Sequence, residues 1–285
     1  MFKSIAMRGY IFWAVYIAVA VVCQIIFGDF PSGFFGFPVN AAVMLLWLAV
    51  LWVMFREKRD SAPVRMLLSR QTTLVLIGVF IAACLVQGFS RSRLTGSWWF
   101  VAVLFALLSH IFLVLLRGMS HPRPYRLRFF LNHAGLFLAL AGGMFGSPDN
   151  RDWRTVAVTE APTREAVDID GHRTALEHSF RLVDLKVESY ENGAPRNYEA
   201  TVMIDEEKEA VLKVNHPCRL SWKDDLYLSG IKEGGCILQV VRHPWKYMEF
   251  IGIIMLLAGA VLVFLQGPAG QAGQAGTTEE RRAGK

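Results

Sequence analysis

Six long apolar blocks constrain the fold of this chain more than any other feature of its sequence. They cover residues 11–27, 39–55, 72–89, 98–116, 129–145 and 247–265, and Glu249 is the only Lys, Arg, Asp or Glu within them. A helix needs about 20 apolar residues to cross the hydrocarbon core of a bilayer, and each block reaches or approaches that length. We therefore expect a membrane α-helical bundle of six transmembrane helices.

Basic residues in the short loops predict how this bundle is oriented. Residues 56–70 contain five basic side chains and residues 117–128 contain four, whereas residues 28–38 contain none and residues 90–97 contain two. Loops rich in Lys and Arg remain on the cytoplasmic side of a membrane. We expect both termini in the cytoplasm and the segment between the fifth and sixth helices outside it.

That segment, residues 147–243, is predicted to be the one water-soluble domain. It has 18 acidic and 13 basic residues, a net charge of −5, while the rest of the chain carries +11. The overall charge of +6 and the pI of 9.2 thus follow from membrane topology and do not support binding to nucleic acid. Short runs rich in Val, Ile, Leu and Tyr alternate with turn-like pieces, among them the hairpin candidate "ENGAPRN". The pattern predicts an extracytoplasmic all-β, sandwich-like domain.

The expected organisation has four parts. Residues 1–146 form a five-helix transmembrane region, residues 147–243 the β domain, residues 244–266 the sixth transmembrane helix and residues 267–285 a tail rich in Gly, Ala and Gln. The tail has no apolar periodicity, so we expect it to be disordered in the cytoplasm. The first helix is expected to stay uncleaved, because no small-x-small cleavage site follows it.

Several catalytic motifs are missing from the sequence. There is no G-x-S-x-G elbow, no H-E-x-x-H, no Walker A loop and no C-x-x-C pair, which argues against self-contained hydrolytic or thiol chemistry. Cys23 and Cys84 lie in apolar blocks and are expected to be small apolar fillers. Cys218 and Cys236 lie in the outer domain, where they form either a disulfide or two unpaired, partly buried thiols.

Two histidines, His110 and His133, fall inside apolar blocks. His110 lies seven residues before Arg117 and His133 five residues after Arg128, so each is within about 10 Å of the cytoplasmic end of its helix. A polar group in a membrane needs a partner or a task, and neutral imidazole is a ligand of haem iron. The alternative role is a hydrogen bond to a backbone carbonyl or a Ser on a neighbouring helix. We favour that alternative for His110, which follows Ser109.

Three short motifs occur in order towards the end of the chain: "VNHP" at 214–217, "YLSG" at 227–230 and "VRHP" at 241–244. Together with the block that carries His133, they resemble the ResB (CcsB) family of cytochrome c biogenesis proteins. That family has a "VN-x-P" strand, a "Y-x-x-G/S" stretch and a "V-x-D-P" step into its last helix. His243 stands here in place of the usual acidic residue. The resemblance covers about residues 71–266, so the first two helices are additions to a four-helix core.

The resemblance implies a role in the system II pathway of cytochrome c biogenesis in the bacterial cytoplasmic (inner) membrane. The family works with CcsA, a membrane protein that carries a tryptophan-rich haem-handling motif, and together they move haem b outwards for covalent attachment to apocytochrome c. The family's histidine in its third core helix is a proposed axial ligand of this haem and corresponds to His133. This chain has no tryptophan-rich motif, since Trp98 and Trp99 are typical of an interfacial anchor. It would therefore be a subunit of a cytochrome c haem-lyase complex, non-catalytic when alone.

A different class of function fits the same topology. A haem-independent scaffold or sensor would also hold an outer β domain on a helical bundle, and it would not need His133. An ion or solute transporter is a weaker interpretation, because the apolar blocks contain almost no ionisable side chains to line a path.

Overall fold

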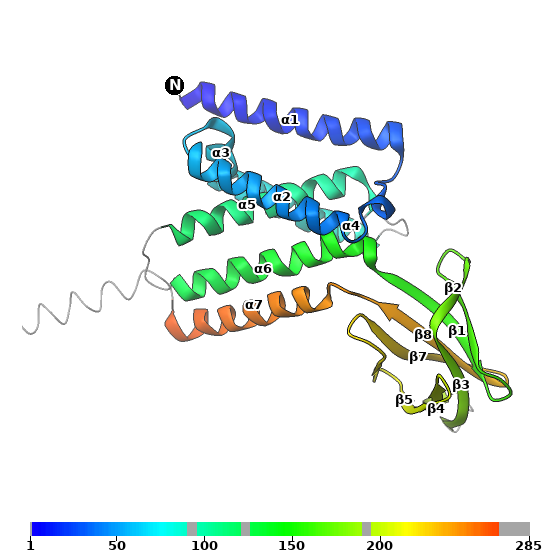
Figure 1. Ribbon diagram of the computed structural model, residues 1–285. Helices are drawn as coiled ribbons and strands as arrows, with labels where there is room; N and C mark the ends of the chain where they lie inside the picture. The colour runs from blue at the N-terminus through cyan, green and yellow to red at the C-terminus, as the bar shows by residue number, and fades with distance from the viewer. Residues whose placement is uncertain (1, 90–95, 121–125, 190–194, 268–285) are drawn as a thin grey trace, which may run out of the picture. The chain divides into compact units, whose positions relative to one another are not determined.

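A computed structural model describes the backbone of residues 2–89, 96–120, 126–189 and 195–267. The chain divides into two compact units, Met1–Pro148 with Tyr247–Lys285, and Asp149–Lys246. The first is helical and the second is a β-sheet domain (Figure 1). The predicted tail lies, except for Gly267, outside the described residues.

In the part of the helical unit that the structure describes, six long helices lie where the apolar blocks predict them. They are α1 (Phe2–Phe27), α2 (Val39–Glu57), α4 (Arg70–Phe89), α5 (Trp98–Met119), α6 (Arg126–Gly146) and α7 (Lys246–Gln266). Among the described residues, five of these helices are long and apolar enough to cross a membrane, namely α2 and α4 to α7, whereas the apolar stretch of α1, Ile11–Phe27, is shorter. The described structure therefore supports a helical membrane protein with five candidate spans.

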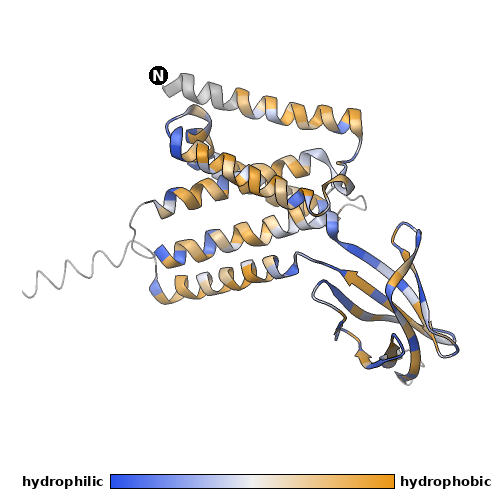
Figure 2. Ribbon diagram, viewed as in Figure 1, coloured by the Kyte–Doolittle hydropathy of each residue, from blue (hydrophilic) through white to orange (hydrophobic). Residues whose placement is uncertain are grey.

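Large apolar side chains point outwards from these helices, which are hydrophobic along most of their length (Figure 2). Leu74 is 74% exposed, Phe89 90% and Phe264 88%. Water-soluble proteins rarely expose apolar patches on this scale, so the exposed surface is suited to lipid.

Among the described residues, shorter helical elements accompany the long ones: η1 (Ser32–Phe35), η3 (Ser147–Asp149) and α3 (Ala62–Leu67). The sequence pattern did not predict α3, which lies in the basic loop after α2. Its local signal is Ser61 at the N-cap position followed by Pro63 in the first turn. Proline is favoured there because its missing N–H is not needed by the helix.

Helix α5 is the centre of the helical unit, since α1, α2, α4 and α6 all pack against it. Leu108 and Leu113 on α5 are completely buried. Trp47 on α2 donates a hydrogen bond from its indole Nε1 to the hydroxyl of Ser109, over 3.2 Å, and its ring packs against Phe105 of α5. This contact gives α2 both an apolar and a polar attachment to the central helix.

Helices α6 and α7 approach one another at backbone distance (Figure 1). A Cβ atom at Gly135 would lie 2.7 Å from the carbonyl oxygen of Gly252, and a Cβ at Gly252 would lie 2.5 Å from the backbone nitrogen of Ala139. Real Cβ contacts are never this short, so the packing requires glycine at both positions. Small residues allow this close approach, which adds van der Waals contact between helices that lipid cannot replace.

The β unit is a single antiparallel sheet of eight strands. The strands are β1 (Arg151–Val158), β2 (Thr163–Asp168), β3 (Arg173–Ser189), β4 (Pro195–Ile204), β5 (Lys208–Lys213), β6 (Cys218–Arg219), β7 (Asp224–Lys232) and β8 (Gly235–Arg242). Their order in the sheet is β5-β4-β3-β2-β1-β8-β7-β6. Strands β3 and β4 pair where "ENGAPRN" predicts a hairpin, although residues 190–194 of that turn lie outside the described residues.

The predicted all-β domain is therefore present, but its strands form one antiparallel sheet instead of the two sheets of a sandwich. Strand β5 also lies against β7, six places away in the sheet order, so the sheet curls over its own core. Phe180, Leu212, Leu226 and Leu238, from four different strands, are completely buried in that core. In a curled sheet the two ends face each other across the core, as the two sheets of a sandwich do. The alternation of apolar and polar residues is the same in both folds, so it does not distinguish them.

The "VNHP" motif, expected to be a strand, forms a turn between β5 and β6. Asn215 has a positive φ of 61°, a conformation that asparagine tolerates better than most residues. The Nδ1 atom of His216 donates to the carbonyl of Val214 over 2.9 Å, which closes the turn.

The α6–α7 contact predicts a strong effect of one added methyl group. We expect Gly252→Ala to lower the stability of the protein in detergent by about 1–3 kcal/mol, because the new Cβ would collide with the backbone of α6. The matched control is Gly78→Ala on α4, where a Cβ would meet nothing within 4 Å. Thermal unfolding checks both variants, and equal melting temperatures for the two would contradict the packing described here.

Candidate functional site

His133 is held in a defined orientation on α6. Its Nδ1 atom lies 2.9 Å from the carbonyl oxygen of Phe129, one helical turn earlier. Since a carbonyl only accepts, Nδ1 must be the donor, and in the neutral imidazole the lone pair then resides on Nε2. The imidazole also stacks on the Phe129 ring, with centroids 4.1 Å apart and planes 27° from parallel.

The Nε2 atom of His133 is the chemically available part of this side chain. Within the described residues it has no hydrogen-bond partner, and the side chain is half-buried. A neutral imidazole with its Nδ1–H engaged and its Nε2 open is the form that coordinates a metal ion. The position predicted from the sequence thus carries an imidazole in the form that can bind a metal ion.

His110 has a different environment on α5. Its Nδ1 atom is 2.5 Å from the carbonyl oxygen of Leu67 in α3, and its Nε2 is 3.1 Å from the hydroxyl of Thr73 in α4. Both ring nitrogens are therefore engaged, and the residue is only 4% exposed. This arrangement corresponds to the hydrogen-bonding role, in which His110 ties α5 to α3 and α4. As arranged, neither nitrogen is open to iron.

Further polar contacts surround His110 where α3 meets α4. The hydroxyl of Thr72 donates to the carbonyl of Met66 over 2.8 Å, and Arg117 of α5 donates to the carbonyl of Leu68 over 3.3 Å. The carbonyls at the end of α3 lack partners within their own helix, so these side chains, together with the backbone N–H of Ser69 on the Met66 carbonyl, satisfy them. This polar cluster is structural in character.

Cys218 and Cys236 are both free thiols, so the disulfide considered from the sequence is not formed. Cys218 is opposite Leu226, and Leu226 is opposite Val240, four residues along β8 from Cys236. The two cysteines are thus two strands apart and displaced by on the order of 13 Å along the strands, beyond the reach of a disulfide. Burial raises the pKa of the Cys236 thiol to about 11, which makes it a poor nucleophile.

A pocket of about 190 Å³ opens in the β domain. Its apolar wall includes Trp153 and Leu176, and its charged wall includes Glu177, Asp224 and Arg242. The Arg242 guanidinium lies 5.1 Å from the centre of the Trp153 ring. It donates to Asp224 over 2.7 Å and to Glu177 over 2.6 Å, so the charges of the pocket are paired with one another.

The carboxyl groups of this pocket are held in their charged forms. Burial alone would raise the pKa of Asp224, but hydrogen bonds from Arg242 and Ser221 outweigh it and hold the pKa below its ordinary value. The hydrogen bond from Arg242 lowers the pKa of Glu177, and Lys223 adds to this effect. The pocket is therefore an ionised network at neutral pH.

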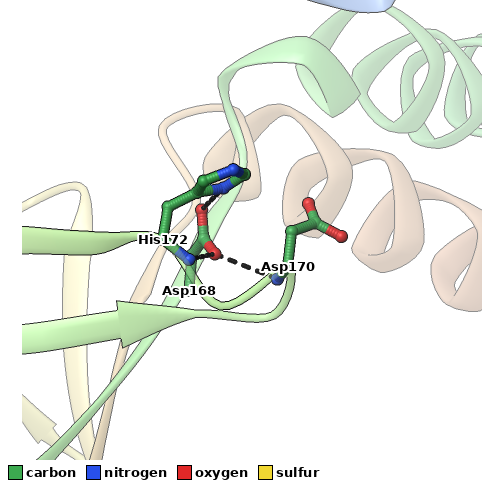
Figure 3. A group of neighbouring side chains, drawn as sticks. All are labelled: Asp168, Asp170 and His172. Carbon is green, nitrogen blue, oxygen red and sulfur yellow. Dashed lines mark hydrogen bonds and ion pairs between the residues drawn. The ribbon is translucent and has the colours of Figure 1, made fainter.

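Asp168, Asp170 and His172 gather in the turn between β2 and β3 (Figure 3). One oxygen of Asp168 accepts from the backbone N–H of Asp170 over 2.9 Å and of His172 over 2.8 Å, and these bonds explain the arrangement as a hairpin turn. The other oxygen lies 3.2 Å from Nδ1 of His172. The backbone N–H of His172 is the main cause that lowers the pKa of Asp168. Asp170 and His172 are exposed and Asp168 is partly buried, and the Asp168 carboxylate is satisfied within the turn.

Sequence reasoning missed three residues that define the histidine environments: Phe129, Gly118 and Thr73. Phe129 carried a signal, since it precedes His133 by four residues and so lies on the same face of the helix. Gly118 packs against Phe129 from α5, and Thr73 reaches His110 from α4. Contacts between helices of this kind leave no local pattern in the sequence.

The long apolar helices and the β domain between α6 and α7 define a membrane protein of mixed α-helical and β-sheet construction. Residues 121–246 match the ResB-like family. The resemblance noted in the sequence is thereby confirmed, and it supports a role in cytochrome c biogenesis. No curated protein matches the chain.

The chain is also similar to a solved structure named Cytochrome c Heme Lyase CcmF. The two are 14% identical, with a TM-score of 0.39, and the similarity covers 91% of this chain and 45% of that chain. This chain therefore spans less than half the length of that protein.

The Arg242–Asp224 pair predicts a pH-dependent stability. We expect Asp224→Asn to destabilise the β domain by about 1.5–3 kcal/mol at pH 7, since it removes a charged hydrogen bond from a buried site. The pKa of Asp224 is lowered in the folded state, so this stabilisation is complete above the ordinary carboxyl pKa, about 4, and is lost as pH falls through the folded pKa. The variant and the natural protein should converge on acidification.

Urea unfolding of the full-length protein in detergent, followed by tryptophan fluorescence, measures this difference. Asp184→Asn is the matched control, because the Asp184 side chain is 55% exposed and lies 3.9 Å from Lys186. An Asp224→Asn variant that is as stable as the control at pH 7, or whose deficit does not shrink as the pH is lowered below about 4, would refute the assignment.

Proposed function

We propose that this protein holds haem b as it crosses the bacterial cytoplasmic membrane, together with a CcsA-type partner, and presents it for covalent attachment to apocytochrome c. The observation that carries the proposal is the His133 imidazole, whose Nδ1 is fixed by the Phe129 carbonyl while Nε2 remains open among the described residues. Its helix, α6, lies within residues 121–246, which match the ResB-like family. An intramembrane histidine with an open nitrogen is a functional candidate by default.

The residues of this chain would orient the ligand for iron. The hydrogen bond from Nδ1 to Phe129 selects the tautomer, and it increases the electron density that Nε2 can donate. Axial imidazole coordination would in turn influence the reduction potential of the bound haem. Since the two nitrogens of His110 already have partners, the second axial ligand is proposed to come from the CcsA-type partner.

The β domain is proposed to lie outside the cytoplasmic membrane, with both termini in the cytoplasm, as the basic loops predict. There it would meet apocytochrome c or brace the partner. Its free thiols offer no redox pair, because Cys218 and Cys236 are far apart and the pKa of Cys236 is raised. We therefore propose that the chain is a non-catalytic subunit of a haem-lyase complex, and that the attachment chemistry belongs to its partner and substrate.

A haem-independent scaffold or sensor is the second candidate function. One observation favours it: the Nδ1 bond to Phe129 already satisfies half of the hydrogen-bonding capacity of His133. A half-satisfied, half-buried imidazole can persist in a helical bundle without any ligand. The two candidates differ in whether haem is bound.

The haem proposal predicts opposite results for the two intramembrane histidines. Co-purified with its partner, the His133→Ala variant should lose most of the Soret absorption and fail to support cytochrome c maturation. The His110→Ala variant should keep its Soret band but be about 1–3 kcal/mol less stable, because the Leu67 carbonyl loses its buried donor. Absorption spectra at matched protein concentration, together with thermal unfolding, separate these effects.

His172→Ala serves as the control, since that exposed residue lies in a hairpin turn of the β domain. An unchanged Soret band in His133→Ala would reject the ligand role and leave the scaffold as the better candidate.

A further inference from the structure

Gly118, near the end of α5, lies directly beneath the ring of Phe129. A Cβ atom at Gly118 would overlap the Cε1 and Cζ atoms of that ring, which would have to move. Gly118 is also buried. The aromatic ring of one helix thus occupies the space that a side chain on the neighbouring helix would otherwise fill.

The same residue makes two contacts with His133. The Phe129 ring stacks on the imidazole at a centroid distance of 4.1 Å, and the Phe129 carbonyl accepts from Nδ1 over 2.9 Å. One contact fixes the plane of the imidazole and the other fixes its tautomer. Both act on the direction in which Nε2 points.

We infer that Gly118 is a positioning residue for His133, which it acts on through the ring of Phe129. The inference rests on the proposed function, since it concerns the direction of the Nε2 atom that would bind haem iron. Residues that orient a metal-ligating histidine typically change metal affinity by about 10–100-fold when they are altered.

The character of the Gly118 contact distinguishes it from helix packing. A Cβ at Gly135 or Gly252 would strike backbone atoms of the opposite helix, which cannot yield without separating the helices. The three atoms nearest to a Cβ at Gly118 all belong to the Phe129 ring, a side chain that can rotate away. Gly118→Ala should therefore turn the ring and the imidazole stacked on it, while the helices stay packed.

The test compares haem binding in the complex with the CcsA-type partner. Gly118→Ala is expected to lower haem occupancy by roughly tenfold and shift the Soret maximum, with a melting temperature close to that of the natural protein. Phe129→Leu is the second variant, because it adds no volume and removes the stacking while keeping the carbonyl; it should shift the spectrum in the same direction. Gly78→Ala, on an open face of α4, is the matched control.

An imidazole rescue isolates the positioning effect. In a His133→Gly background, added imidazole can bind iron without being attached to α6, so Gly118→Ala should no longer alter haem occupancy there. A persistent effect in that background would show that Gly118 acts by some route other than His133 and would overturn the inference.

The remaining outcomes are distinguishable. Haem binding that is unaffected by His133→Ala would remove the proposed function and this inference with it. Haem binding that is lost in His133→Ala but normal in both Gly118→Ala and Phe129→Leu would overturn the inference alone. If Gly118→Ala does not fold, Phe129→Leu tests the same route through the ring, and normal haem binding in that variant would overturn the inference.

Discussion

Hydrocarbon offers no hydrogen-bond partners, so each polar group on a membrane helix must find a partner in the protein or in a ligand. This constraint organises the helical unit around α5. His110 meets it completely, with one nitrogen on the Leu67 carbonyl and the other on the Thr73 hydroxyl. Because both acceptor and hydroxyl come from other helices, satisfying His110 also fixes the short helix α3 and the start of α4 against the centre of the bundle.

His133 meets the same constraint only in part, and the difference lies in where its partner comes from. The Phe129 carbonyl belongs to its own helix, so the bond orients the imidazole without joining α6 to a neighbour. Attachment of α6 to α7 depends instead on Gly135 and Gly252, which bring the two backbones together. Helix α6 therefore packs on α7 through glycines, and His133 is not needed for that contact. That separation makes His133, and not His110, suited to holding a ligand.

The sequence predicted the long helices and the β domain well, because solvent dictates both patterns over many residues. A helix that crosses hydrocarbon needs a long apolar block, and a strand of a half-buried sheet needs apolar and polar residues in alternation. The sequence did not predict α3, the single curled sheet or the turn at Asn215, since these depend on short signals and strand order. At the site, His133 could be identified from its unusual surroundings. The roles of Gly118 and Thr73 could not, because each acts across a helix pair, and the separation of Cys218 from Cys236 depends on register.

The departure at His243 from the family's "V-x-D-P" step can be understood from the contacts around it. The backbone N–H of His243 donates to the carbonyl of Lys223 over 2.7 Å, a bond that any residue other than proline can make. Two basic residues near it form ion pairs with β7: Arg242 with Asp224, and Lys246 with Asp225. Beside the β7–β8 ladder itself, one main-chain bond and two ion pairs thus hold the connection from β8 into α7 against the start of β7. An acidic side chain at position 243 is not required for any of these three contacts, so the substitution preserves the step into the final helix.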